Sequence, residues 1–335
     1  MSDQSADSED RQLPAIDRLQ WGKLRDWVQL IRLPTSFTLI SNVIAAAVVA
    51  TGNLQPLTAF VPILIASLLA YWAGMILNDV VDLDEDKKHR PGRPLPAGRI
   101  SPVIAGHVAT AFLFLTPIIV LGVMSFHQVE ALWLGASFVS AALLSCCVRL
   151  YDSSLKATPL GPVLMGSCRA FNICMVGASF IAVSGEDLAW QHPAAYALGI
   201  GVYILGLTIY ASSEELSESS KGLLGMGLIV EMAGLAILAA IPMWLPSEER
   251  NWALNPAGGY PLLIGLIGIT VVRQGLTGIQ QPVPRRVQLA VRHAILSIIL
   301  VDAGVATMWG TYWHGLAVAL LLVPALVSSL RVRAT

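Results

Sequence analysis

The chain has 335 residues, of which 55% are hydrophobic and 13% charged, and its formal net charge at pH 7 is −1. This composition, with a mean hydropathy of +0.66, excludes an ordinary soluble domain and indicates a polytopic membrane protein. A net charge so close to zero gives no electrostatic basis for nucleic-acid binding, which we therefore do not expect.

Residues 1–33 are polar and mixed in charge, and we expect them to form a separate N-terminal segment. Within this segment Trp21, Leu24 and Trp27 recur at near-helical spacing among basic residues. Such a pattern is typical of a helix that lies in the membrane interface. The second predicted region, residues 34–335, is a transmembrane domain.

Long apolar stretches follow one another through this second region. Most of them reach the roughly 20 residues that a spanning helix needs. They are continuous rather than alternating, which excludes the strands of a membrane barrel. We therefore predict an all-α integral membrane helix bundle with nine to ten spans. The stretches are residues 34–52, 58–77, 102–124, 130–148, 160–183, 193–211, 222–245, 258–280, 287–309 and 312–330.

The loops between these stretches differ in charge. With a cytoplasmic N-terminus, the loops after the even-numbered stretches and the C-terminal residues carry the Lys and Arg, whereas the opposite loops carry only Arg250. This positive-inside pattern favours ten crossings with both termini and the basic loops in the cytoplasm. We expect the membrane to be the inner membrane of a bacterium.

The most charged segment, residues 78–101, reads NDVVDLDEDKKHRPGRPLPAGRIS and joins two of the apolar stretches. Five carboxylates come first and five Lys and Arg residues follow. So many charges would be costly within hydrocarbon, so the segment must lie at the membrane surface or line a polar cavity.

The spacing within this segment suggests a metal site. Asn78, Asp82 and Asp86 are four residues apart, so a continuing helix would place them on one face. Their oxygens suit Mg²⁺, which takes one or two carboxylates and binds substrate phosphates through its other positions. Arg90 and Arg93 could hold the same phosphates. A solvated loop whose basic half sets the topology fits the spacing equally well.

The order of residues in this segment, NxxxDxxxD followed by RPxRPLxxGxIS, resembles the first aspartate-rich motif of the UbiA family of intramembrane prenyltransferases. The resemblance implies the fold of that family. It also implies that the aspartates bind Mg²⁺ and, through the metal, an isoprenoid diphosphate.

Two further polar residues follow the fourth stretch on the same side. Lys156 is placed to hold the diphosphate as a point charge. The ring face of Tyr151 could stabilise an allylic cation.

An arginine lies deep within the fifth stretch. Arg169 and Asn172 are three residues apart and so share one face of a helix. An arginine at this depth is a candidate functional residue, here for diphosphate binding together with Asn172. Alternatively, Arg169 pairs with a buried acid, Asp302 or Glu231, and holds two helices together.

A second acidic cluster, YASSEELSESSKG, occupies residues 210–222. The second motif of the UbiA family contains a Lys-Asp pair and further aspartates, and this chain has neither. Glu214 and Glu218 still share a helical face and could bind Mg²⁺. The alternative is a polar turn that caps the next helix. Together with the segment around Arg169 and the LVDA run at residues 300–303, this cluster most resembles the UbiA-like branch called EboC.

The resemblance implies transfer of an isoprenoid group from its diphosphate to a lipophilic or aromatic acceptor. Asp82 and Asp86 would act in catalysis through Mg²⁺, and the main contribution of the protein would be electrostatic stabilisation of the leaving group. Two alternatives are a UbiA-type terpene cyclase, which needs no acceptor, and a non-catalytic isoprenoid or lipid binder or transporter that kept the fold.

Overall fold

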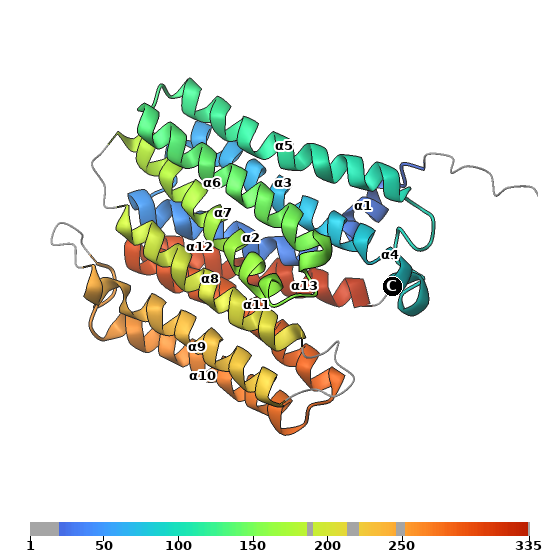
Figure 1. The fold of residues 1–335 in the computed structure, drawn as a ribbon. Coiled ribbons are helices and arrows are strands. Elements are labelled where there is room, and N and C mark those ends of the chain that lie inside the picture. Colours follow the sequence, from blue (N-terminus) through green and yellow to red (C-terminus); the bar gives the residue numbers. More distant parts are fainter. Residues whose placement is uncertain (1–19, 186–189, 213–220, 246–251, 334–335) are drawn as a thin grey trace, which may run out of the picture.

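The computed structural model describes residues 20–185, 190–212, 221–245 and 252–333. Within these ranges the regular secondary structure is helical and no strand occurs, which confirms the predicted fold class (Figure 1). Nine of the described helices are long and apolar enough to cross a membrane. These nine are α2 (Leu33–Thr51), α3 (Leu57–Val81), α5 (Pro102–Phe126), α6 (Ala131–Leu150), α7 (Leu160–Ser184), α8 (Gln191–Ser212), α9 (Lys221–Trp244), α10 (Gly259–Gln280) and α11 (Pro284–Trp309).

The tenth predicted stretch consists of two helices. They are α12 (Tyr312–Leu320), which the side chain of Thr311 caps, and α13 (Leu322–Arg333). Each is shorter than a spanning helix. The choice between nine and ten crossings therefore stays a prediction.

Helix α2 lies in the interior of the bundle. From α5 to α11 each helix packs against the next, α3 packs against α5, and α2 packs against α3, α7, α8 and α11. Of the nine candidate spans, α2 has the largest buried share, 67% of its most apolar window. Its small side chains, such as Ser41 and Ala45, allow neighbouring helices to approach closely on several sides.

Helices α8 and α9 also pack closely. A Cβ atom on Gly206 would clash with the backbone nitrogen of Glu231, and one on Gly234 would lie 2.5 Å from that of Tyr203. Larger side chains at these positions would force the two backbones apart. Gly206 and Gly234 therefore serve the close packing of α8 against α9.

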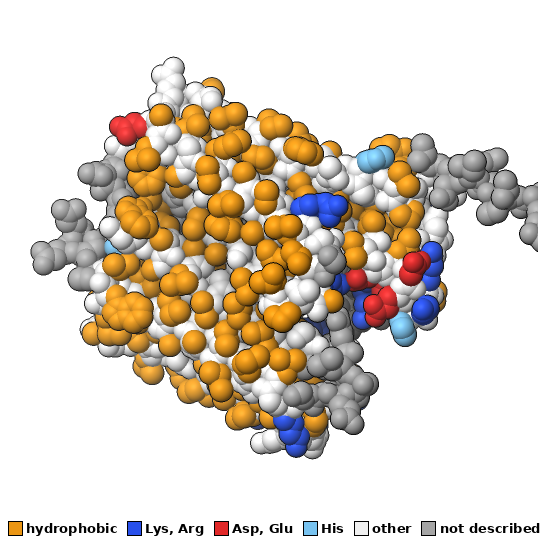
Figure 2. Space-filling view, in the orientation of Figure 1, with side chains coloured by type: hydrophobic (Ala, Val, Ile, Leu, Met, Phe, Trp, Pro, Cys, Tyr) orange, Lys and Arg blue, Asp and Glu red, His pale blue; other side chains and the backbone are white. Residues whose placement is uncertain are grey.

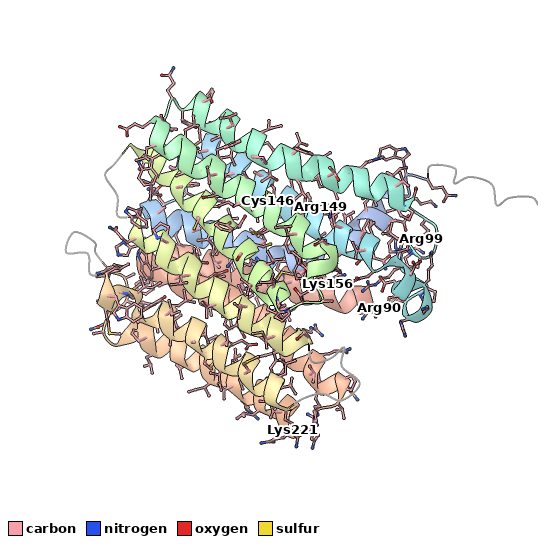
Figure 3. All side chains as sticks on the ribbon, in the orientation of Figure 1. Arg90, Arg99, Cys146, Arg149, Lys156 and Lys221 are labelled. Carbon is pink, nitrogen blue, oxygen red and sulfur yellow. The ribbon has the colours of Figure 1, made fainter. Side chains whose placement is uncertain are left out.

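The charged loops meet at one end of the bundle. Helices α3, α6, α8 and α10 all end here, because successive helices of the bundle run in opposite directions (Figure 1). Figure 3 shows Arg90, Arg99, Lys156 and Lys221 at this end. In Figure 2 the visible face is largely covered by hydrophobic side chains, and most visible charges gather at its right-hand edge. The chain is an integral membrane protein, and the cytoplasmic position of this end stays a prediction.

The predicted N-terminal helix is present as α1 (Leu24–Leu30). Arg99 Nε donates to Asp26 Oδ1 at 2.7 Å, and this pair joins α1 to the loop before α5. The backbone N–H of Lys23 and the Arg99 guanidinium lower the pKa of Asp26. The interfacial position of α1 and the boundary between residues 33 and 34 stay predictions.

Candidate functional site

The predicted face of Asn78, Asp82 and Asp86 exists in the structure. Helix α3 ends at Val81 and a short helix, α4 (Leu83–His89), follows. The helical register continues across the junction, because Asp82 N–H donates to Asn78 O and Asp86 N–H donates to Asp82 O, both at 2.9 Å. The three residues therefore lie on successive turns of the chain at the charged end.

Arginines from two separate segments bind Asp79 and Asp86. Arg93, which follows α4, donates to Asp86 at 2.6 Å and to Asp79 at 3.3 Å. Arg32, directly before α2, donates to Asp79 at 2.7 Å. Arg90 lies 3.7 Å from Asp86. These contacts join the start of α2 to the chain on both sides of α4.

A lysine from a third segment binds the remaining aspartate of the face. The π-helical turn η1 (Tyr151–Leu155) follows α6, and Lys156 comes directly after it. Lys156 Nζ donates to Asp82 Oδ2 at 2.5 Å. The Asn78 amide is best satisfied when it accepts from Lys156 at 3.0 Å and donates to Asp82 at 3.3 Å.

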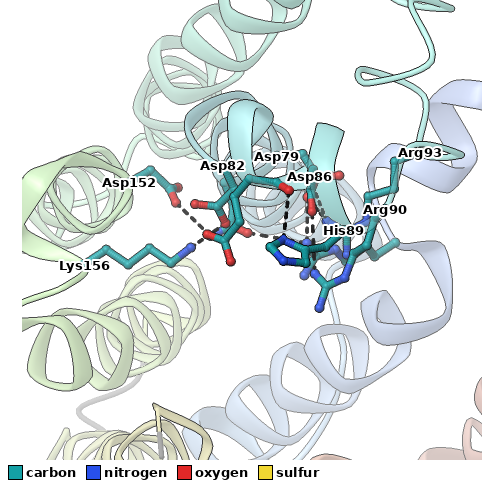
Figure 4. Close-up of polar contacts among 11 residues, drawn as sticks. Asp79, Asp82, Asp86, His89, Arg90, Arg93, Asp152 and Lys156 are labelled. Atoms are coloured by element: carbon teal, nitrogen blue, oxygen red, sulfur yellow. Dashed lines mark hydrogen bonds and ion pairs between the residues drawn. The ribbon is translucent and has the colours of Figure 1, made fainter. Parts of the chain in front are cut away.

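Figure 4 shows how these side chains converge. Asp152, in the turn η1, lies 3.4 Å from the Asn78 amide. We call this group the polar cluster; it comprises Arg32, Asn78, Asp79, Asp82, Asp86, Arg90, Arg93, Asp152 and Lys156.

The polar cluster is only partly shielded from outside. About a quarter of the side chains of Asp82, Arg93 and Lys156 is exposed (26%, 25% and 24%), whereas Asp79 and Asp86 are nearly buried (6% and 4%). Partial burial strengthens charge-assisted hydrogen bonds to a ligand. Because Asp82, Arg93 and Lys156 stay accessible, a bound polyanion and metal ion could take over their pairing.

The residues present fit a Mg²⁺ ion whose coordination is completed by a phosphate ligand. Such a site needs only one or two protein carboxylates, and Asp82, Asp86 and the Asn78 amide supply suitable oxygens. In the described part of the chain no three His, Cys, Asp or Glu side chains form a metal-binding group by themselves. Glu214 and Glu218 lie outside the described residues, so their metal role stays a prediction.

Arg169 does not bind the polar cluster. From α7 its guanidinium donates to Asn42 Oδ1 at 2.8 Å and to Thr38 Oγ1 at 3.1 Å, both on α2. Its Cζ atom lies 5.5 Å from the centroid of the Tyr71 ring. The structure therefore places Arg169 against the inner face of α2, and its role in diphosphate binding stays a prediction.

The structure links Arg169 to a buried acid, as in its alternative role, but the link is indirect. Asp302 on α11 is fully buried, and it accepts hydrogen bonds from Ser41 at 2.5 Å, Tyr196 at 2.6 Å and Asn42 at 2.8 Å. Arg169 is thus connected to Asp302 through Asn42 and not by a direct ion pair. We call this group the inner network; it comprises Thr38, Ser41, Asn42, Arg169, Tyr196 and Asp302.

Two other predicted site residues lie near these groups. Asn172 on α7 is 2% exposed, and neither its amide oxygen nor its amide nitrogen has a hydrogen-bond partner among the described residues. Tyr151 begins the turn η1 and is half-buried beside Asp152. The binding role of Asn172 and the cation-stabilising role of Tyr151 stay predictions.

Sequence reasoning did not assign Arg32, Asp79 or Asp152 to the site. Asp79 is not part of the four-residue pattern, but it comes seven residues before Asp86, and Arg93 bonds both carboxylates. Arg32 comes before an apolar stretch, where a basic residue usually marks topology. The one available signal for Asp152 is its position between Tyr151 and Lys156.

The fold and the polar cluster define a membrane-embedded helix bundle with a cluster of charged side chains at one end. Residues 39–269 match the model of the UbiA prenyltransferase family. The chain is 32% identical over 294 residues to a digeranylgeranylglyceryl phosphate synthase of Ignicoccus hospitalis, and this match covers 84% of the chain and 92% of the relative. The chain belongs to the UbiA prenyltransferase family.

Solved structures share the fold. One, described under digeranylgeranylglyceryl phosphate synthase in membranes, has a TM-score of 0.62 at 16% identity and covers 85% of this chain and 98% of its own. A UbiA homologue from Archaeoglobus fulgidus, bound to DMAPP and Mg²⁺, has a TM-score of 0.52 at 15% identity and covers 88% of this chain and 99% of its own. The finer resemblance to the EboC branch stays a prediction.

Proposed function

We propose that the protein is a Mg²⁺-dependent prenyltransferase that moves an isoprenoid group from its diphosphate to a lipophilic or aromatic acceptor. The observation that carries this proposal is the convergence of Arg32, Arg93 and Lys156, from three separate segments, on Asp79, Asp86 and Asp82 at the junction of α3 and α4. This combination of cations with oxygen ligands matches a diphosphate bound together with a divalent metal.

The side chains of the polar cluster have separate tasks in this proposal. Asn78, Asp82 and Asp86 would hold the metal ion, together with Glu214 and Glu218 if these form a second group. When bound, Mg²⁺ neutralises the negative charge that grows on the leaving diphosphate. Arg90, Arg93 and Lys156 would donate hydrogen bonds to the same oxygens, which favours departure of the diphosphate.

The apolar bundle would keep water away from the reacting carbon. The polar cluster lies at the end of α3, so a diphosphate held there can direct its hydrocarbon chain among the helices. An allylic cation formed in such surroundings is protected from hydrolysis. We propose that Tyr151, at the start of η1, faces this cation.

The relatives support the proposed donor, an isoprenoid diphosphate, more closely than the proposed acceptor. The Archaeoglobus homologue binds DMAPP and Mg²⁺, which is the donor chemistry proposed for this chain. The name of the Ignicoccus relative indicates a glyceryl phosphate product. We therefore include a glyceryl phosphate lipid among the acceptors to be tested. We further propose that the site faces the cytoplasm, in a bacterial inner membrane.

An assay of the protein in lipid nanodiscs tests this function. Dimethylallyl or geranyl diphosphate is added with Mg²⁺ or with EDTA, and aromatic and glyceryl phosphate acceptors are supplied in parallel. We expect pyrophosphate release that requires Mg²⁺, together with an acceptor whose mass has grown by one prenyl group. A hydrocarbon product without an acceptor would indicate the terpene cyclase. Diphosphate binding without any release, under all these conditions, would indicate a non-catalytic binder.

A further inference from the structure

A groove of about 680 Å³ runs between α9 and α10 on the outside of the bundle. Small residues hollow it: Ala236 and Ala239 on α9, and Gly265 and Gly268 on α10. Gly265 is exposed, and no atom lies within 4 Å of the position that a Cβ atom would take there. The groove is separate from the polar cluster, since none of its lining residues belongs to that cluster.

Most of the groove is apolar and about as long as one leaflet of a bilayer. Its lining on α10 extends from Pro261 to Val272 before the first charged residue. Eleven steps along an α-helix correspond to roughly 17 Å. The hydrocarbon core of a bilayer is about 30 Å thick, so a single leaflet contributes roughly half of that. An extended acyl chain of one leaflet therefore fits the apolar part.

The other end of the groove is polar. Arg273, Thr277 and Gln280 follow at helical spacing on α10 and line this end. Arg273 is exposed, and no ion pair reaches it within the described part of the chain. Arg273 lies seven residues before the end of α10, within the predicted span, and an exposed cation there is costly unless it reaches an anionic group. Gln280 ends the helix about 10 Å further on, so Arg273 can extend toward the layer of lipid phosphates.

We propose that this groove binds one anionic phospholipid of the surrounding membrane. Its phosphate accepts hydrogen bonds from Arg273, with Thr277 and Gln280 beside it, and one acyl chain lies along the groove toward Pro261. The charge of Arg273 selects an anionic headgroup over a zwitterionic one. Because α10 ends on the side of the basic loops, the lipid belongs to the leaflet on that side. This proposal does not depend on the prenyltransferase reaction.

Native mass spectrometry of the full chain tests the proposal. The detergent-purified protein is incubated with phosphatidylglycerol or with phosphatidylcholine, and retained lipid is counted by mass. Arg273→Gln removes the charge, and Gly265→Leu fills the groove. The matched controls are Arg149→Gln, which removes another exposed cation, and Gly122→Leu, which fills open space on α5.

We expect the wild type and both controls to retain one phosphatidylglycerol in preference to phosphatidylcholine. Arg273→Gln and Gly265→Leu should each lower this retention at least fivefold while the protein stays folded. Equal retention of the two lipids by the wild type would overturn the proposal, as would unchanged retention in both groove variants. Displacement of phosphatidylglycerol by geranyl diphosphate would instead assign the groove to an isoprenoid. A dimer that Gly265→Leu dissociates would assign it to a second copy of the chain.

Discussion

The polar cluster and the inner network both bring charges into an apolar bundle, but they do so in different ways. In the polar cluster Asp82 and Lys156 pair while each keeps about a quarter of its side chain exposed (26% and 24%). In the inner network Asp302 is fully buried and accepts three hydrogen bonds from α2 and α8. The first arrangement leaves charges accessible to a ligand, whereas the second satisfies a buried acid completely.

The two regions should therefore respond differently to substitution. An accessible ion pair contributes little to folding, since solvent already stabilises the separated charges. A buried acid with several donors is costly to disturb, because each donor would be left unpaired in hydrocarbon. We therefore expect substitutions of the accessible pair, Asp82 and Lys156, to affect activity and those in the inner network to affect stability.

The largest effect is expected from Asp302→Ala. It leaves the donors of Ser41, Asn42 and Tyr196 without their common acceptor. We expect a loss of about 3–5 kcal/mol in the free energy of unfolding, as for other broken buried charge networks. Thermal unfolding in detergent measures it, and Asp302→Asn, which keeps one acceptor oxygen, should lose less. Unchanged stability in Asp302→Ala would remove the distinction between the two regions.

Asp82→Asn tests the other side of the comparison. It removes a charge from the predicted metal face, so turnover should fall by about 10²–10³-fold, as when one stabilising group of a transition state is lost. Stability should change by less than about 1 kcal/mol, because the pair with Lys156 is accessible. The control is Asp84→Asn, since Asp84 is exposed and pairs with Lys87 at 3.2 Å. Wild-type diphosphate binding and turnover in Asp82→Asn would contradict the proposed site.

The double change Glu214→Gln/Glu218→Gln asks whether the second acidic cluster belongs to the site. If these residues hold a second metal ion, turnover should fall at least about tenfold, equivalent to about 1.4 kcal/mol. Diphosphate affinity should change less, because the charge on the leaving group grows in the transition state. Turnover and binding are measured side by side. Unchanged turnover would show that the cluster is structural and that one metal ion is sufficient.

The smallest effect is expected from Asn172→Leu. Whether this substitution raises or lowers the free energy of unfolding distinguishes a ligand-binding amide from a structural one. Both amide atoms of Asn172 are buried without partners among the described residues. If the amide binds a ligand, replacing it with an apolar side chain should lower activity. The same replacement should raise the free energy of unfolding by about 1 kcal/mol, because no buried polar atom is then left unpaired. Asn42→Leu is the matched control and should destabilise, because its amide is fully bonded. A loss of stability in Asn172→Leu would assign the amide to the fold.

The amino-acid sequence by itself determined the class of fold and one face of the site. Continuous apolar stretches can cross a membrane only as helices, because the backbone must satisfy its own hydrogen bonds there. The face of Asn78, Asp82 and Asp86 could also be predicted, because residues four apart stay aligned wherever a helix continues. Both inferences depend on local geometry, which sequence spacing specifies directly.

Only the tertiary structure decided which cations meet the aspartates at the junction of α3 and α4 and what surrounds Arg169. Arg32 and Lys156 lie 47 and 74 residues from the partners they bind, Asp79 and Asp82. Asn42 comes between Arg169 and Asp302 because α2, α7 and α11 pack together in the bundle. Such pairings follow from helix packing, in which small residues and close approach select the neighbours. No spacing along the chain specifies those neighbours, so contacts across the bundle could not be predicted from the order of residues.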